Sequence, residues 1–329
     1  MSRTSGHTSD ARTSDARTPA SRTSVEIASQ PAAWRRAAEA AADFDGLPAP
    51  GERVAVTGCG TSWFMALAYA ALREAAGLGE TDAFAASEFP AGRRYDRVVA
   101  VTRSGTTTEV LDLLGTLRGR LPTTALTADP KTPVMTAADT VAVLDWADEE
   151  SVVQTRFATT ALAFLRAGLG DLSGGPSGRL PGGQPGLKSV ADAAVDAELA
   201  LTEPLPEAVL GADQWTFLGR GWTYGLALEA ALKMREAAGA WTEAYPAMEY
   251  RHGPIAVTAP GRVTWVLGPL PEGLAGDVAR VGGTLVSRPG TDPLADLVRA
   301  QRLAVTVAES RGLDPDRPRG LTRSVILSP

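Results

Sequence analysis

Cysteine, histidine and long apolar runs are scarce in this 329-residue chain, and each scarcity excludes a class of structure. The one cysteine, Cys59, excludes an internal disulfide framework and a CxxC metal site. No run approaches the roughly 18 to 20 apolar residues of a membrane span, so a cytoplasmic protein without a membrane partner is expected. Chemistry that needs an imidazole has two histidines to draw on, His7 and His252.

Basic charge is not in excess either. The formal net charge is −6, which argues against a nucleic-acid partner, so an anionic ligand must be held by a local field. Hydrophobic residues make up 44% of the chain and charged residues 21%, as in a soluble globular protein long enough for two packed lobes. Neither a metal nor an organic cofactor is predicted.

The N-terminal residues 1–24 are rich in Ser, Thr and Arg, and they repeat TSDAR. They contain no apolar signal-peptide core, so they predict a disordered arm, and His7 lies within it. The next stretch, SVEIASQPAAWRRAAEAAADF, predicts a helix from the spacing of its apolar residues, with Pro31 tolerated in a first turn.

Short apolar strands then alternate with helices. Strands are predicted in RVAVTGCG, RVVAVTRSG, PTTALTAD and TVAVLDW, and helices in TSWFMALAYAALREAAG, TTTEVLDLLGTLRGR and RFATTALAFLRAGLG. This alternation predicts an α/β fold, with a parallel sheet covered by helices on both faces.

A second series of the same order follows a Gly/Pro-rich stretch at residues 170–189, which is predicted to link two lobes, 25–169 and 190–329. This series contains the strands QWTFLGRG and VTWVLGP and the helix WTYGLALEAALKMREAAG. VAVTGCGTSWF can be laid over WTFLGRGWTYG with Gly58 on Gly219 and Gly60 on Gly221. A duplicated unit is therefore expected.

A loop rich in hydroxyl side chains follows one strand, in VAVTRSGTTTEVL. Ligands of open parallel sheets bind beyond the carboxyl ends of strands, where a following helix presents unpaired N–H groups. Phosphomonoester donors are predicted at Thr102, Ser104 and Thr107, with Gly105 allowing close approach and Ser62 in a similar turn. A plain helix cap by Thr106 or Thr107 explains the loop about equally well.

Lys233 and Glu236 are three residues apart on one predicted helix, so they share a face, where the ammonium can keep the carboxylate ionised. A solvated ion pair is the alternative interpretation. His252 lies in the RHGP loop and can move a proton near neutral pH.

Together these motifs resemble the SIS (sugar isomerase) family. They are most similar to the isomerase half of glucosamine-6-phosphate synthase and to stand-alone relatives that isomerise or deaminate amino-sugar phosphates. The resemblance spans Glu26 to Val325, in EIASQP, GCGTS, TRSGTT, ESVVQTR, the segment from LGRGW to YRHGP, and DRPRGLTRSV. The last of these is similar to the family's C-terminal segment that closes over the sugar, so the second lobe is expected to end in a closing segment. It implies two tandem SIS lobes, each a flavodoxin-like parallel sheet with helices on both faces.

The resemblance also implies a phosphate site. Its contacts fall on Thr102, Ser104 and Thr107, and Ser62 carries over directly. Arg103 and Gln154 are expected to bind the substrate as well, at positions that depart from the synthases: Arg103 stands where they carry glutamine, and Gln154 where they use serine.

For the chemistry, the resemblance implies that Glu236 is the base, with Lys233 beside it, and that His252 opens the sugar ring from the partner subunit of a homodimer with shared sites. Arg323 replaces the synthases' C-terminal lysine. Because a guanidinium stays protonated, Arg323 can orient or neutralise an oxyanion but cannot form an imine.

The implied activity is ring opening and C2 proton abstraction on glucosamine 6-phosphate or N-acetylglucosamine 6-phosphate, of the aldose-ketose isomerase or deaminase type. No glutaminase domain is expected, so the nitrogen must arrive on the sugar. Two alternatives stay open. The same base can drive loss of the C3 hydroxyl from the acetylated sugar, as in a dehydratase, or the chain can be a non-catalytic sugar-phosphate sensor, although its arm is too short for a helix-turn-helix.

Overall fold

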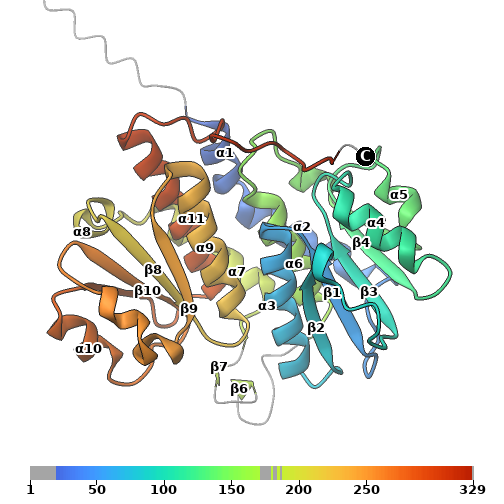
Figure 1. Cartoon of the computed structure of the whole chain (residues 1–329), viewed down its shortest axis with the longest axis horizontal. Coiled ribbons are helices and arrows are strands. Elements are labelled where there is room, and N and C mark those ends of the chain that lie inside the picture. Colours follow the sequence, from blue (N-terminus) through green and yellow to red (C-terminus); the bar gives the residue numbers. More distant parts are fainter. Residues whose placement is uncertain (1–19, 171–178, 181–183, 186, 328–329) are drawn as a thin grey trace, which may run out of the picture.

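Two parallel sheets with helices between and outside them make up the computed structural model, which describes residues 20–170, 179–180, 184–185 and 187–327 (Figure 1). The first sheet has the strand order β2 (Thr81–Ala85), β1 (Val54–Gly58), β3 (Arg97–Val101), β4 (Thr123–Thr127), β5 (Thr140–Val143). All of its pairings are parallel, so the carboxyl ends of its strands lie at one edge.

The second sheet is also parallel, in the order β11 (Thr284–Ser287), β10 (Arg262–Leu267), β8 (Gln214–Gly219), β9 (Thr242–Pro246). A short antiparallel pair, β6 (Arg179–Leu180) with β7 (Gln184–Pro185), lies between the two sheets in the chain. The predicted α/β class with parallel sheets is confirmed. The predicted linker at residues 170–189 lies largely outside the described residues.

Within the described residues, the space between the sheets is filled by α2 (Gln30–Ala42), α3 (Thr61–Ala75), α6 (Arg156–Ala167), α7 (Val190–Thr202), α9 (Thr223–Ala238) and α11 (Pro293–Ser310). One continuous hydrophobic core runs through them and through the inner faces of both sheets, and Trp34, Trp215 and Trp265 are fully buried in it. This shared core holds α3 against α9, so that the start of α3 at Thr61 lies beside Lys233 of α9.

The outer faces carry smaller layers. Helix α4 (Thr108–Leu117) and the short α5 (Val134–Ala137) cover the first sheet over Ala55, Val98 and Ala100. Helix α10 (Leu274–Arg280) covers the second sheet over Leu218 and Val266. The remaining short elements are α8 (Glu207–Leu210), η1 (Ala86–Glu88), η2 (Asp145–Ala147), η3 (Glu249–His252) and η4 (Pro254–Val257).

The N-terminal helix begins earlier than predicted. Residues 1–19 of the predicted arm lie outside the described residues, but α1 (Arg22–Ala28) already includes residues assigned to that arm. The Ser21 hydroxyl caps α1 at Ser24, and the Asp316 carboxylate accepts from the N–H groups of Arg22 and Thr23. The single helix predicted there is divided at Ser29, and Pro31 lies in the first turn of α2, where its missing N–H is tolerated.

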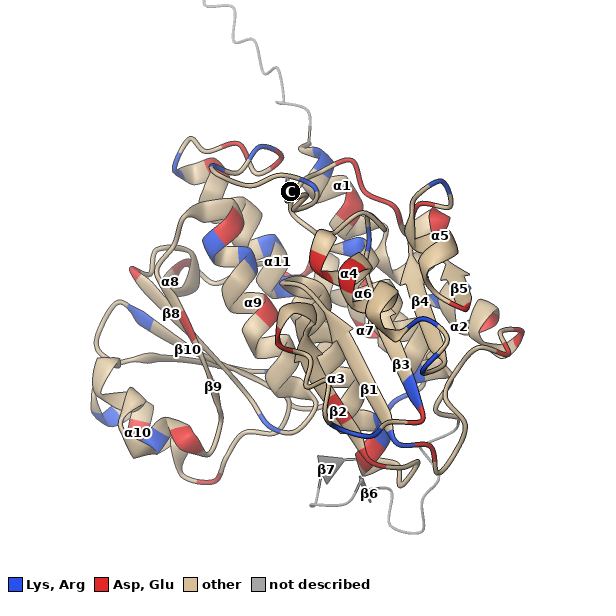
Figure 2. Ribbon diagram, turned by 45° about the vertical axis from the view of Figure 1, so that its right-hand side comes forward, with Lys and Arg blue, Asp and Glu red and all other residues tan. Residues whose placement is uncertain are grey.

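Charged residues of both signs are interspersed along the ribbon, including on α9 (Figure 2). Among the helices in the described part of the chain, none has the length and apolar character needed to cross a membrane.

Candidate active site

The turn from β1 into α3 is tight, and glycine makes it so. Gly60 has a φ of 54°, and a Cβ at Gly58 would lie 2.8 Å from the backbone carbon of Ser62. The first turn of α3 can therefore approach the end of β1 closely. Thr61 and Ser62 begin this helix, and each is only 4% exposed.

Residues 102–107, rich in hydroxyl side chains and called the hydroxyl loop below, join β3 to α4 beside that turn. Gly105 has a φ of 62°, and a Cβ there would lie 2.1 Å from the Thr132 hydroxyl oxygen. The Thr106 hydroxyl donates to the Ser104 hydroxyl at 3.1 Å. Thr107 is the N-cap residue of α4, but its side chain makes no capping hydrogen bond. The geometry thus favours hydroxyls directed into a common site over the plain helix cap.

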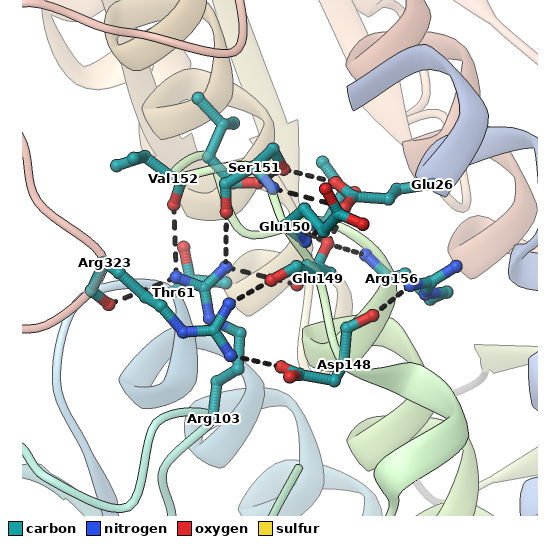
Figure 3. A network of polar contacts seen from close by, with 12 residues as sticks. Glu26, Thr61, Arg103, Asp148, Glu149, Glu150, Ser151, Val152, Arg156 and Arg323 are labelled. Carbon is teal, nitrogen blue, oxygen red and sulfur yellow. Dashed lines mark hydrogen bonds and ion pairs between the residues drawn. The ribbon is translucent and has the colours of Figure 1, made fainter. Parts of the chain in front are cut away.

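Arg103, in the same loop, is engaged by protein atoms. Its guanidinium lies 3.4 Å from the Glu149 carboxylate and donates to the carbonyl oxygens of Ser151, Val152 and Arg323 at 3.2, 3.3 and 3.1 Å (Figure 3). The side chain is 4% exposed. Arg103 therefore ties the hydroxyl loop to the segment that precedes α6 and to the C-terminal residues.

Glu26, in α1, holds the same segment from the other side. Its carboxylate accepts from the N–H groups of Glu150 and Ser151 at 2.6 and 3.2 Å, and from the Ser151 hydroxyl. Burial raises the pKa of Glu26, although the Ser151 hydrogen bond opposes this. The leading helix thus fixes the loop that carries Gln154.

Among the buried polar atoms of this region that have no hydrogen-bond partner within the described residues are the Thr102 hydroxyl oxygen and the Gln154 side-chain nitrogen. Buried polar groups normally find a partner, so these are free to meet a ligand or water. Arg323 differs from them: its guanidinium donates to the Glu149 carbonyl and to the Asp148 carboxylate, so its side chain extends along the loop (Figure 3).

A buried charge cluster lies on α9, across from the β1–α3 turn. The Lys233 ammonium donates to the Glu236 carboxylate and, at 3.0 Å, to the Thr61 hydroxyl, and it lies 3.4 Å from Glu229. The side chains of Lys233 and Glu229 are 1% and 0% exposed, whereas that of Glu236 is 17% exposed. Glu236 is thus the member of the cluster that reaches solvent, and the solvated ion pair considered from the sequence is wrong for Lys233.

Burial and neighbouring opposite charges shift the pKa values of Glu229 and Lys233 in opposite directions. Burial raises the pKa of Glu229 to about 8, an effect that Lys233 reduces. For Lys233, burial acts to lower the pKa, but Glu229 and Glu236 outweigh it and the net shift is upward. The ammonium therefore stays charged beside Glu236. Sequence reasoning missed Glu229, although its spacing of four residues from Lys233 was the available signal.

His252 ends η3 and is exposed, next to Gly253 with a φ of 140°. This element follows β9 in the second sheet, and no described contact joins His252 to the α9 cluster. The structure thus brings Lys233, Glu236 and Thr61 together and leaves His252 available on the surface.

No family model matches the chain. The glutamine–fructose-6-phosphate aminotransferase (isomerizing) of Aeropyrum pernix is 31% identical over 325 residues, covering 86% of this chain and 52% of that protein. The aminotransferase of the same name from Gloeobacter violaceus is 29% identical over 317 residues, covering 84% and 52%. The chain therefore spans about half the length of these curated relatives.

Solved structures share the fold. A glucosamine-6-phosphate deaminase from Thermotoga maritima superposes with a TM-score of 0.77 at 24% identity, over 93% of this chain and all of that one. A tagatose-6-phosphate ketose/aldose isomerase from Escherichia coli gives 0.72 at 19% identity, over 95% and 99%. The predicted resemblance is confirmed: the chain has homologues named glutamine–fructose-6-phosphate aminotransferase (isomerizing), and it shares its fold with solved structures of a sugar-phosphate isomerase and of a glucosamine-6-phosphate deaminase.

Proposed function

We propose that this chain is an amino-sugar phosphate enzyme of the aldose-ketose isomerase or deaminase type, acting on glucosamine 6-phosphate or N-acetylglucosamine 6-phosphate. One observation carries the proposal. The buried Lys233 joins Glu236 to Thr61, and Thr61 directly precedes Ser62 at the start of α3. Because β1 pairs in parallel with β3, the turn after β1 and the hydroxyl loop lie at the same edge of the first sheet, which supports a shared site.

In this proposal the phosphate is bound by the hydroxyls of Ser104 and Thr107 and by the backbone at Gly105, with Ser62 and Thr102 alongside. The unpartnered Thr102 hydroxyl and Gln154 nitrogen supply further hydrogen bonds to the ligand. Such hydroxyl and amide donors suit a phosphomonoester, which Arg103 does not contact because its guanidinium is already engaged.

The sugar ring opens by proton transfer between its ring oxygen and O1, for which His252 of a partner subunit is the proposed group. Glu236 then takes the C2 proton, and Lys233 keeps its carboxylate ionised. From glucosamine 6-phosphate, the resulting enolamine takes a proton at C1 and leaves an imine at C2. Water adds to that imine, and ammonia and the ketose 6-phosphate are released.

The side chain of Arg323 limits which substrates this proposal allows. Its charged guanidinium lies against the Asp148 carboxylate and cannot form an imine with a free ketose. This favours a sugar that already carries nitrogen. For the acetylated sugar, the same C2 carbanion can expel the C3 hydroxyl, so dehydration is the second candidate.

A non-catalytic sensor is the third reading, and the α9 cluster argues against it. Burying the Lys233 ammonium costs desolvation free energy, and its carboxylate partners offset that cost. Binding alone would need only the hydroxyl loop, whereas an ionised base with a buried ammonium partner serves proton transfer.

We further propose that the two sheets are two tandem SIS lobes, 25–169 and 190–329. Their shared strand order supports this: β2-β1-β3-β4 in one and β9-β8-β10-β11 in the other. Gly60 and Gly221 have similar φ values of 54° and 58°, and a Cβ at Gly58 or at Gly219 would collide with the helix that follows.

The test is to incubate the chain with each sugar phosphate in deuterium oxide. Deuterium at C2 of the recovered sugar phosphate supports proton abstraction. Release of ammonia identifies a deaminase, and a product lighter by one water identifies a dehydratase. Tight binding of both sugars with no exchange and no product would instead support the sensor.

A further inference from the structure

The C-terminal strap, residues 322–327, crosses the hydroxyl loop in this structure. Figure 1 shows the C-terminal trace running from the end of α11 past α1 to the top of α4. The contacts join residues that are more than 200 positions apart in the sequence. They involve the hydroxyls to which the proposed function assigns the phosphate.

Ser324 lies at the centre of these contacts. Its hydroxyl oxygen is 3.1 Å from that of Ser104, 3.0 Å from that of Thr106 and 3.4 Å from that of Thr107. A phosphate oxygen bound by Ser104 and Thr107 would need this same space, since hydrogen-bonded oxygens sit about 2.5 to 3.0 Å apart. Ser324 and a phosphate oxygen cannot both occupy it.

The strap also takes the donor that α4 would offer to an anion. The Val325 carbonyl accepts from the N–H of Thr108, the first residue of α4, at 3.2 Å. The Leu327 N–H in turn donates to the Thr108 hydroxyl at 2.9 Å. A helix N-terminus binds anions through such free N–H groups, so the strap blocks the helix end as well as the hydroxyls.

Anchors before Ser324 hold the strap in place. The Arg103 guanidinium donates to the Arg323 carbonyl at 3.1 Å, and the Arg323 side chain donates to Glu149 and Asp148. The strap's apolar side chains contribute little to holding it in this position, because Val325, Ile326 and Leu327 are 53%, 68% and 56% exposed. Polar contacts and little buried apolar surface make a segment that can detach without unfolding its neighbours.

We propose that the strap is an autoinhibitory element, in which Ser324 occupies the phosphate subsite and must be displaced before a sugar phosphate binds. This rests on the proposed function of the hydroxyl loop. The apparent affinity for phosphate is then reduced by the fraction of molecules in which the strap is closed.

The test compares four proteins by calorimetric titration with inorganic phosphate: the wild type, Ser324→Ala, a chain that ends at Leu321, and Ile326→Ala. Ile326 lies in the same strap, and its side chain points into solvent, so Ile326→Ala is the matched control. Inorganic phosphate is used because it reports the subsite without contacts that the strap could make to a sugar. Amide exchange of Thr108, measured without ligand, reports independently whether the strap is closed.

We expect the wild type to protect the Thr108 amide and the shortened chain to lose that protection. Phosphate should bind about three- to tenfold more tightly to Ser324→Ala, and at least as tightly to the shortened chain, with Ile326→Ala unchanged. If both Ser324→Ala and the shortened chain bind phosphate as tightly as the wild type or more weakly, the strap proposal alone is overturned. Ser324 then either has no effect on phosphate binding or donates a hydrogen bond to the phosphate. Failure of all four proteins to bind phosphate or glucosamine 6-phosphate overturns the proposed function, and the strap proposal with it.

Discussion

Lys233 is buried between two carboxylates whose surroundings differ. Glu229 is fully enclosed, whereas Glu236 keeps 17% of its side chain exposed. The ammonium contacts both: the enclosed carboxyl of Glu229, whose pKa burial raises to about 8, and the more exposed carboxylate of Glu236, which is left to meet a ligand. The spacing of Lys233 and Glu236 predicted their contact, since side chains three apart share a helix face. Their burial could not be predicted, because it depends on packing of α9 against α3.

The first prediction is that Glu236→Gln abolishes exchange of the substrate C2 proton with solvent deuterium. An amide cannot accept the proton, so the exchange rate should fall at least about 100-fold, in the range typical of a lost general base. Binding of glucosamine 6-phosphate, followed by calorimetry, should survive. Glu207→Gln on the exposed surface of α8 is the control. Exchange at the native rate in Glu236→Gln would mean that another group is the base.

The second prediction concerns Glu229 and pH. Burial raises its pKa from 4.5 to about 8, so between these values the folded chain binds a proton that the unfolded chain does not. This group therefore stabilises the fold least at high pH, and its contribution falls as pH rises, by at most about 1.4 kcal/mol per pH unit.

Glu229→Gln should remove that dependence, because glutamine does not titrate. Urea unfolding at pH 5, 6.5 and 8 is expected to show the difference in unfolding free energy between variant and wild type shifting in favour of the variant as pH rises. The upward-shifted pKa of Lys233 affects stability only above its usual value of 10.5, outside this range. Parallel pH profiles for the two proteins would contradict the assignment.

At the scale of elements, glycines place the strand ends close to the following helices. The hydroxyl loop can turn only because Gly105 adopts a φ of 62°, with no room for a Cβ beside Thr132. The glycine pattern in the sequence predicted this turn and that of Gly60. It did not predict that Arg103 faces Glu149, since that contact depends on how the loop before α6 is held by Glu26.

The third prediction is a paired comparison within one loop and helix. Gly105→Ala should lower the free energy of unfolding by about 1 to 3 kcal/mol, because the residue would be strained and would collide with the Thr132 hydroxyl. Gly115→Ala, in exposed α4 with nothing within 4 Å of a Cβ, should raise it by about 0.5 to 1 kcal/mol. Chemical denaturation of both variants measures the two free energies of unfolding. Changes of the same sign in both variants would contradict this explanation from backbone strain and from the space available to a Cβ.

The interior strands were predicted, and so was one edge strand, β5, in TVAVLDW. The apolar runs of β1, β3, β4, β8 and β10 are evident in the sequence because both faces of these strands are covered. Strands β2 and β9 were not predicted. Each lies at a sheet edge and is mostly half-buried, and the sequences TDAFA and TEAYP include acidic residues and a proline. Their pairing comes from the neighbouring strand rather than from their own pattern.

At the scale of the whole molecule, contacts distant in sequence complete the site. Lys233 reaches Thr61 across 172 positions, and Ser104 reaches Ser324 across 220. Local patterns do not contain such information, and neither of these contacts was predicted from the sequence. The family resemblance implies a partner subunit for His252, whose exposed position on η3 leaves it open to such a contact.

The fourth prediction tests whether each site is shared between two chains. If Glu236 of one chain works with His252 of its partner, His252→Ala and Glu236→Gln should each be inactive alone. Mixing them under conditions of subunit exchange forms hybrid dimers in which one site has both native residues. Random pairing makes about half the dimers hybrids, each with one good site of two, so about a quarter of native activity should return. Exchange is verified with differently tagged chains, and mixing wild type with either variant controls for dilution. If verified exchange restores no activity, His252 serves its own chain's site or takes no part in the reaction, and the homodimer with shared sites is wrong.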